Sequence, residues 1–149
     1  MQLESMYQEI ILDHYRSPLN KGLREPFDVE VHHVNPTCGD EVTLRVRLDG
    51  DVVSDVSYDG GGCSISQASE SVMTELVKGR SIAEGMERAD EFVSMMHAQG
   101  HSEPDEELLE DAVAFAGVAR YPARVKCALL GWMAWKDAVS RASSLEEKS

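Results

Sequence analysis

Apolar residues near the start of the chain recur every three or four positions, which is the spacing of an α-helix with one buried face. The stripe consists of Leu3, Met6, Tyr7, Ile10, Ile11 and either His14 or Tyr15. Ser17-Pro18 comes directly after it, and proline clashes with a continuing helix. The pattern therefore predicts a first helix over residues 3–15.

Between residues 27 and 60 the apolar spacing changes to two, which is typical of strands with one face in water. The apolar residues of three such segments are Phe27, Val29 and Val31, then Val42, Leu44, Val46 and Leu48, then Val52, Val53, Val56 and Tyr58. Asp49-Gly50 lies between the last two segments, and this pair favours a tight hairpin because the turn requires positive φ. The sequence predicts a three-stranded antiparallel meander.

After Cys63 the helical spacing returns. Ser64 with Gln67, and Ser81 with Glu84, resemble capping boxes, which predicts two helices that begin at these serines and end near residues 79 and 97. The stripe that predicts a third helix consists of Leu108, Leu109, Ala112, Val113 and Ala116.

The last predicted helix begins at Tyr121-Pro122, since the first turn of a helix does not need the N–H that proline lacks. With the helix before the sheet, this makes about five helices and three strands. We predict an α+β fold in which the helices pack mainly on one face of the sheet. The chain has 149 residues, and we expect residues 1–142 to form a single domain and residues 143–149 a polar, frayed tail.

Charge and cysteine content narrow the class of protein. The formal net charge is −13, which disfavours nucleic acid as a partner because phosphate binding needs a basic face. No basic segment precedes an apolar run at the N-terminus, and no apolar run is long enough to span a membrane. An odd number of cysteines, three, favours reduced thiols over a disulfide framework. We expect a cytoplasmic protein without a membrane partner.

The three cysteines and one aspartate are candidate metal ligands. Cys38 and Asp40 lie in the connection between the first two predicted strands, Cys63 lies at the start of a helix, and Cys127 lies early in the last helix. Three thiolates with one carboxylate form a plausible tetrahedral zinc shell. The alternative is that each cysteine is a small buried apolar residue. The position of all three at ends of elements favours the metal site.

Three sequence blocks around these residues resemble the IscU-like superfamily of iron–sulfur assembly proteins. The blocks are Asn-Pro-Thr-Cys-Gly-Asp at 35–40, Gly-Gly-Gly-Cys-Ser-Ile-Ser-Gln-Ala-Ser at 60–69, and Lys-Cys-Ala-Leu-Leu-Gly-Trp at 126–132. The resemblance extends over residues 7–135. It is greatest to the SufU branch, because Lys126 stands where scaffold-type members have histidine and because residues 92–118 resemble the insertion of that branch.

The resemblance implies a zinc protein that takes persulfide sulfur from a SufS-type cysteine desulfurase, an enzyme that uses pyridoxal phosphate. The ligands it implies for one Zn²⁺ are Cys38, Asp40, Cys63 and Cys127, and Cys38 is also the implied sulfur acceptor. We interpret Arg124 as a supporting residue that balances charge near the site or contacts the partner. Downstream scaffold proteins of the Suf system are further expected partners.

Two other functions are open to the same residues. A sulfur-rich shell can hold a [2Fe–2S] cluster, as on an IscU-type scaffold, although Lys126 in place of histidine disfavours this. A purely structural zinc module is the other alternative, but aspartate is unusual in structural zinc sites.

Other polar residues are interpreted as structural. Gly100 interrupts the helix that would align His97 with His101, so we do not expect a second metal there. We interpret the acidic run over residues 103–111 as stabilising a helix N-terminus, and Met95-Met96 as core.

Overall fold

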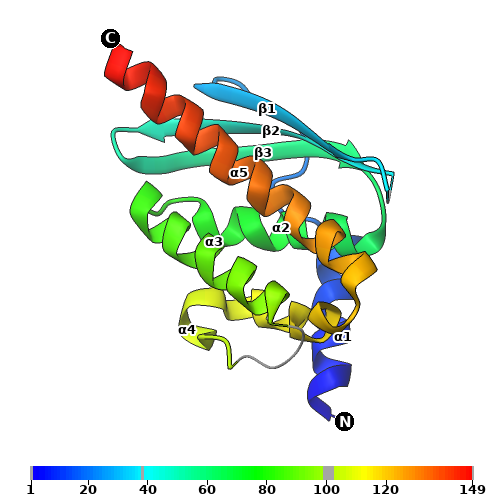
Figure 1. Ribbon diagram of the computed structural model, residues 1–149. Coiled ribbons are helices and arrows are strands. Elements are labelled where there is room, and N and C mark those ends of the chain that lie inside the picture. Colours follow the sequence, from blue (N-terminus) through cyan, green and yellow to red (C-terminus); the bar gives the residue numbers. More distant parts are fainter. Residues whose placement is uncertain (1, 38, 99–102, 149) are drawn as a thin grey trace.

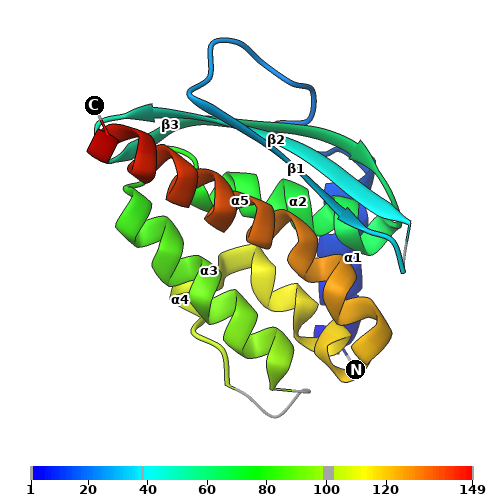
Figure 2. The same ribbon diagram turned by 45° about the horizontal axis from the view of Figure 1, so that its top comes forward.

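The computed structural model describes residues 2–37, 39–98 and 103–148. The elements are α1 (Gln2–Arg16), β1 (Val29–Asn35), β2 (Asp40–Asp49), β3 (Val52–Gly61), α2 (Ser64–Val77), α3 (Ile82–His97), α4 (Glu106–Leu109), the 3₁₀ helix η1 (Glu110–Arg120) and α5 (Pro122–Lys148). Figure 1 shows α5 running across the sheet, with α2 and α3 beside it. The helices gather on one side of the sheet when the molecule is turned (Figure 2). The predicted α+β architecture is confirmed.

The sheet is the predicted antiparallel meander, with strand order β1-β2-β3. Gly50 and Asp51 form the turn between β2 and β3, and Gly50 has φ 63°, as the hairpin prediction required. At the opposite end of the sheet, Asn35 pairs with Asp40, so the β1–β2 connection spans only the residues between them. This connection is where the first cysteine block lies.

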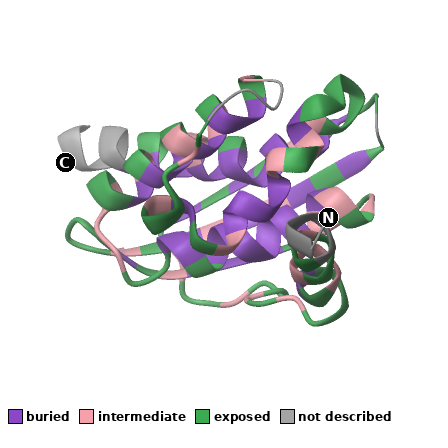
Figure 3. Cartoon of the chain, turned by 90° about the horizontal axis from the view of Figure 1, so that it is seen from below, coloured by how far each residue is buried: buried purple, intermediate pink, exposed green. Residues whose placement is uncertain are grey.

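The core lies between the sheet and the helices, where the buried residues gather in Figure 3. Trp132 and Trp135 of α5 are fully buried, and the ring of Trp132 stacks on Phe92 of α3 at 4.7 Å between centroids. Met95 and Met96 are also buried, which confirms their interpretation as core. Such dense aromatic packing fixes α5 against α3 and the sheet.

The segment between α1 and β1 covers the free edge of β3. The N–H of Gly22 donates to the carbonyl of Tyr58, and the N–H of Tyr58 donates to the carbonyl of Asn20. Arg24 anchors the segment through two hydrogen bonds to Asp55, which hold the pKa of that carboxyl below its usual value. Pairing of this edge removes a surface that would otherwise be open to other chains.

One predicted helix and one predicted helix cap differ in the structure. The helix predicted through residues 108–116 is divided, because Glu110 has φ 46° and ends α4 before η1 begins. Apolar residues three and four apart fit a 3₁₀ helix as well as an α-helix, so the sequence pattern did not distinguish them. The capping box predicted at Ser64 and Gln67 is also wrong. Cys63 occupies the N-cap of α2 and makes no side-chain cap bond.

Other helix predictions hold. The capping box of Ser81 and Glu84 is present at the start of α3, and the last helix begins at Pro122. Asp105 accepts hydrogen bonds from the N–H groups of Glu107 and Leu108, so part of the acidic run caps α4 as interpreted. That residues 1–142 form one domain, with a frayed tail after it, stays a prediction.

A substitution at Gly85 of α3 tests how closely the core is packed around Trp135. A Cβ at Gly85 would lie 2.7 Å from Cζ2 of the buried Trp135, whereas a Cβ at Gly117 would meet nothing within 4 Å. We expect Gly85→Ala to lower the free energy of unfolding by about 1–3 kcal/mol through overpacking. The control Gly117→Ala should leave it unchanged or raise it by less than about 1 kcal/mol. Urea denaturation measures both, and equal effects would contradict the close contact with Trp135.

Candidate metal centre

Three of the four predicted ligands converge at one end of the sheet. One ligand atom from each of Asp40, Cys63 and Cys127 lies within 4.8 Å of the others. Asp40 begins β2, Cys63 precedes α2, and Cys127 lies in the second turn of α5. Figures 1 and 2 both show the start of β2, the start of α2 and the start of α5 side by side. Cys38 lies outside the described residues.

Asp40 is fixed by the backbone at Cys63. Its Oδ1 accepts the N–H of Cys63 at 2.9 Å, while Oδ2 lies 3.9 Å from Cys63 Sγ. Around zinc, sulfur and oxygen ligand atoms are roughly 3.5 Å apart, given bonds of about 2.3 and 2.0 Å. The hydrogen bond therefore holds one carboxylate oxygen and leaves the other near ligand spacing.

Gly62 permits this close approach. Its φ is 148°, and a Cβ at this position would collide with Oδ1 of Asp40 and come within 2.8 Å of Ser66 Oγ. A glycine at position 62 is thus required by backbone geometry as well as by space.

The two described cysteines differ in exposure. Cys63 is partly exposed at the N-terminus of α2. Cys127 is fully buried inside α5. Asp40 is also fully buried. Two thiols and a carboxylate in this setting suit a thiophilic divalent cation such as zinc, because a buried carboxylate needs a compensating positive charge.

Glu70 is a buried acid that the sequence reading missed. It is 2% exposed on α2, and a Cβ at Gly131 of α5 would lie 2.7 Å from its Cγ. Burial, together with the charge of Asp40, raises the pKa of Glu70 to about 8. Glu70 lies seven positions after Cys63, two helical turns along the same face, and this spacing was the available signal.

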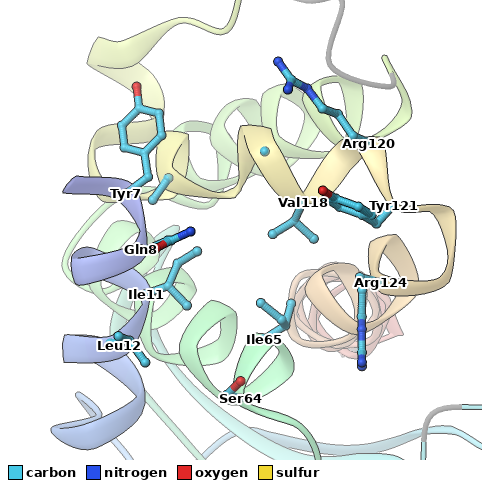
Figure 4. Close-up of a pocket in the computed structure, with 12 residues that line it drawn as sticks. Tyr7, Gln8, Ile11, Leu12, Ser64, Ile65, Val118, Arg120, Tyr121 and Arg124 are labelled. Carbon is cyan, nitrogen blue, oxygen red and sulfur yellow. The ribbon is translucent and has the colours of Figure 1, made fainter. Parts of the chain in front are cut away.

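An open pocket of about 650 Å³ lies beside the start of α2 and the start of α5 (Figure 4). Ile11, Ile65 and Val118 form apolar parts of its wall, and Arg120 and Arg124 belong to its lining. No carboxylate occurs among the described residues that line it. The structure therefore places the predicted supporting residue Arg124 on an accessible, basic and apolar surface, one turn before Cys127.

The histidines outside the cysteine centre lie in other surroundings. The Nε2–H of His33 donates to Oδ2 of Asp137 at 2.9 Å, and this hydrogen bond and the one from Arg141 hold the pKa of Asp137 below its usual value. His97 is exposed at the end of α3, whereas His101 lies outside the described residues. Lys126 is exposed next to the buried Cys127.

Comparison with known proteins identifies the class to which this fold and site belong. Residues 6–128 match the family model of the NifU-like N-terminal domain. The zinc-dependent sulfurtransferase SufU of Bacillus subtilis (strain 168) is 43% identical over 140 residues, covering 93% of this chain and 92% of that protein. The iron–sulfur cluster assembly scaffold protein IscU of Streptococcus pyogenes serotype M1 is 38% identical over 145 residues, covering 97% and 89%.

A solved structure gives the same result. The crystal structure of a putative iron–sulfur cluster assembly scaffold protein for the SUF system from Fervidobacterium islandicum AW-1 superposes with a TM-score of 0.79. Its sequence is 38% identical, and the match covers 90% of this chain and 96% of that chain. The chain belongs to the NifU-like N-terminal domain family, which confirms the resemblance found in its three cysteine blocks. Within the described residues, no helix combines the length and apolar character needed to cross a membrane.

The raised pKa of Glu70 predicts a pH-dependent effect on stability. In the folded protein Glu70 keeps its proton up to about pH 8, whereas in the unfolded chain it ionises around its ordinary pKa of 4.5. Stability is therefore lost as the pH rises between these values. Glutamine is uncharged at every pH in this range. We therefore expect the free energy of unfolding of Glu70→Gln to exceed that of the wild type by roughly 2–3 kcal/mol at pH 8, with no such gain at pH 4.5.

Urea denaturation of the metal-free proteins across this pH range measures the difference. The exposed Glu87 of α3 supplies the control, because Glu87→Gln should follow the wild-type curve at every pH. Parallel curves for Glu70→Gln and wild type would show that Glu70 is ionised in the folded protein.

Proposed function

We propose that this protein is a cytoplasmic, zinc-dependent sulfur acceptor that takes persulfide sulfur from a SufS-type cysteine desulfurase for iron–sulfur cluster biogenesis. The proposed ligands of one zinc ion are Cys38, Asp40, Cys63 and Cys127, with Cys38 as the acceptor. Downstream proteins of the Suf system are the proposed recipients.

The observation that carries the proposal is the convergence of Asp40, Cys63 and Cys127 from three elements that are distant in sequence. The 43% identity to a protein named a zinc-dependent sulfurtransferase supports zinc as the metal. The donor set also fits, since zinc in proteins is bound by thiolate and carboxylate ligands.

The proposed ligands differ in how firmly the fold holds them. Asp40, held by the N–H of Cys63, and the buried Cys127 keep fixed positions, while Cys63 at the helix N-terminus is partly exposed. Cys38 comes from the short connection between β1 and β2, outside both helices. A ligand on such a connection moves away from a shared centre more easily than a ligand within a helix. Zinc, when bound, would keep these thiols deprotonated at neutral pH.

The proposed transfer is a thiolate–persulfide exchange. The Cys38 thiolate attacks the outer sulfur of the persulfide on the desulfurase. A new S–S bond forms on Cys38 while the original S–S bond breaks, and the cysteine of the desulfurase leaves as a thiolate. The exchange has no net oxidation or reduction, so it needs no further reactant.

Arg124 is proposed to support docking of the desulfurase. It is exposed on the rim of the pocket in Figure 4, one turn before Cys127. In a chain of charge −13, a basic position beside the thiols gives a local attraction for an acidic partner surface.

Assembly of a [2Fe–2S] cluster on the same ligands is the second candidate function. The 38% identity to an IscU scaffold favours it, and the exposed Lys126 in place of histidine disfavours it. Colourless protein with about one zinc per chain after aerobic purification would favour the sulfur acceptor over the scaffold.

Desulfurase turnover tests the function directly. We expect addition of the zinc-loaded protein to raise severalfold the rate at which a SufS-type desulfurase forms alanine from cysteine, because persulfide removal frees the enzyme. Arg124→Gln should weaken this activation while zinc content and melting temperature stay unchanged. Arg47→Gln, exposed on β2 and outside the pocket lining, is the charge-matched control. An unchanged rate with wild-type protein would contradict the proposal.

Variants of the three cysteines distinguish the sulfur acceptor from the cysteines that only hold zinc. We expect Cys38→Ser to remain folded but to lose both desulfurase activation and the sulfur adduct of about 32 Da on its peptide. Cys63→Ser and Cys127→Ser should both bind less zinc and have a lower melting temperature, since metal binding is coupled to folding. Mass spectrometry and zinc analysis measure these outcomes, with the adjacent Ser64→Ala as the control. An adduct that maps to Cys127 would show that Cys127, and not Cys38, is the sulfur acceptor.

A further inference from the structure

A second group of metal-ligating side chains lies on the helices away from the cysteines. It consists of His14 of α1, Glu75 of α2 and Asp111 of η1, and one ligand atom from each lies within 4.8 Å of the others. The three elements come together at this point although 36 or more positions separate each residue from the next in the sequence. The sequence pattern showed His14 only as a possible member of the apolar stripe of the first helix.

The imidazole of His14 is buried and its orientation is fixed. The residue is 7% exposed, and Nδ1 lies 2.8 Å from Ser71 Oγ, which also accepts the N–H of Leu19 at 2.8 Å. Nε2 therefore faces the two carboxylates. Metal-ligating histidines are usually held this way, with one ring nitrogen bound to a neighbouring protein group and the other free for the metal.

Distances around Nε2 fit a metal centre. Nε2 lies 3.1 Å from Asp111 Oδ2 and 3.8 Å from Glu75 Oε2. Ligand atoms bonded to one cation at about 2.1 Å are roughly 3.0–3.4 Å from each other. Asp111 already has this spacing, and Glu75 requires a shift of less than about 1 Å. Its side chain is 51% exposed, so rotamer change can supply that shift.

Charge also favours a cation at this point. Two carboxylates face one ring nitrogen, and a single proton on Nε2 can be donated to only one of them, which is Asp111 at 3.1 Å. Glu75 at 3.8 Å lies beyond hydrogen-bond distance of that nitrogen. A divalent cation interacts with both carboxylates and with the nitrogen lone pair at once.

We infer that His14, Glu75 and Asp111 form a second metal site, which takes a divalent first-row cation of the Zn²⁺, Mn²⁺ or Fe²⁺ class. One imidazole and two carboxylates match the ligand preference of these ions, and the half-exposed carboxylates leave coordination positions open to solvent. The inference does not depend on the proposed sulfur transfer, since it uses different residues. Occupancy would tie η1 to α1 and α2.

Metal titration of the intact protein tests this inference. The starting material is protein whose cysteine centre is already saturated with zinc. It is titrated with further Zn²⁺ by calorimetry and, separately, with Mn²⁺ by electron paramagnetic resonance of the free ion. Mn²⁺ prefers oxygen and nitrogen donors to thiolates, so it reports on this site and not on the cysteines. We expect one additional equivalent of at least one of the two metals.

The double variant Glu75→Gln/Asp111→Asn removes both carboxylates while keeping their shapes, and we expect at least a tenfold loss of affinity for that equivalent. Glu106→Gln/Glu107→Gln is the control with the same change in charge, on exposed residues of the neighbouring α4. Melting temperatures measured with a chelator check that both variants fold. Absence of an additional equivalent of either metal, or an equivalent that the double variant retains, would overturn the inference.

Discussion

The close packing of α2 against α5 is the constraint on which the cysteine centre depends. Ser69 Oγ donates to the carbonyl of Ala128 at 2.6 Å, and Gly131 leaves room for the side chain of Glu70. A larger residue at Gly131 would push the helices apart. Because Cys63 precedes α2 and Cys127 lies in the first part of α5, the separation of the two helices sets the separation of the two thiols.

The sheet adds the third ligand to this helix pair. Asp40 is joined to α2 through the N–H of Cys63, so the β1–β2 hairpin end is held against the helix N-terminus. The result is a concentration of acidic groups in the interior, with Asp40 buried and Glu70 protonated by its surroundings up to about pH 8. A bound cation would offset the charge of Asp40, and we therefore expect folding and metal binding to be coupled.

The segment that contains α4 and η1 is connected to the rest of the fold by polar contacts as well as by the core. Phe115 of η1 packs edge-on against Phe92 of α3, while Asp111 reaches His14 of α1. These contacts place η1 next to the pocket whose lining includes Arg120 and Arg124. The segment thus shapes the surface beside the cysteine centre without supplying one of its proposed ligands.

The sequence by itself determined the strand meander, most helix boundaries and the candidate ligands, because hydrophobic spacing and the sequence blocks around the cysteines are local signals. It did not determine the division at Glu110, since spacings of three and four suit both helix types. It also did not reveal the burial of Glu70 or the neighbours of His14. Those properties depend on which faces of distant helices meet, and only the tertiary packing of α1, α2, η1 and α5 decided them.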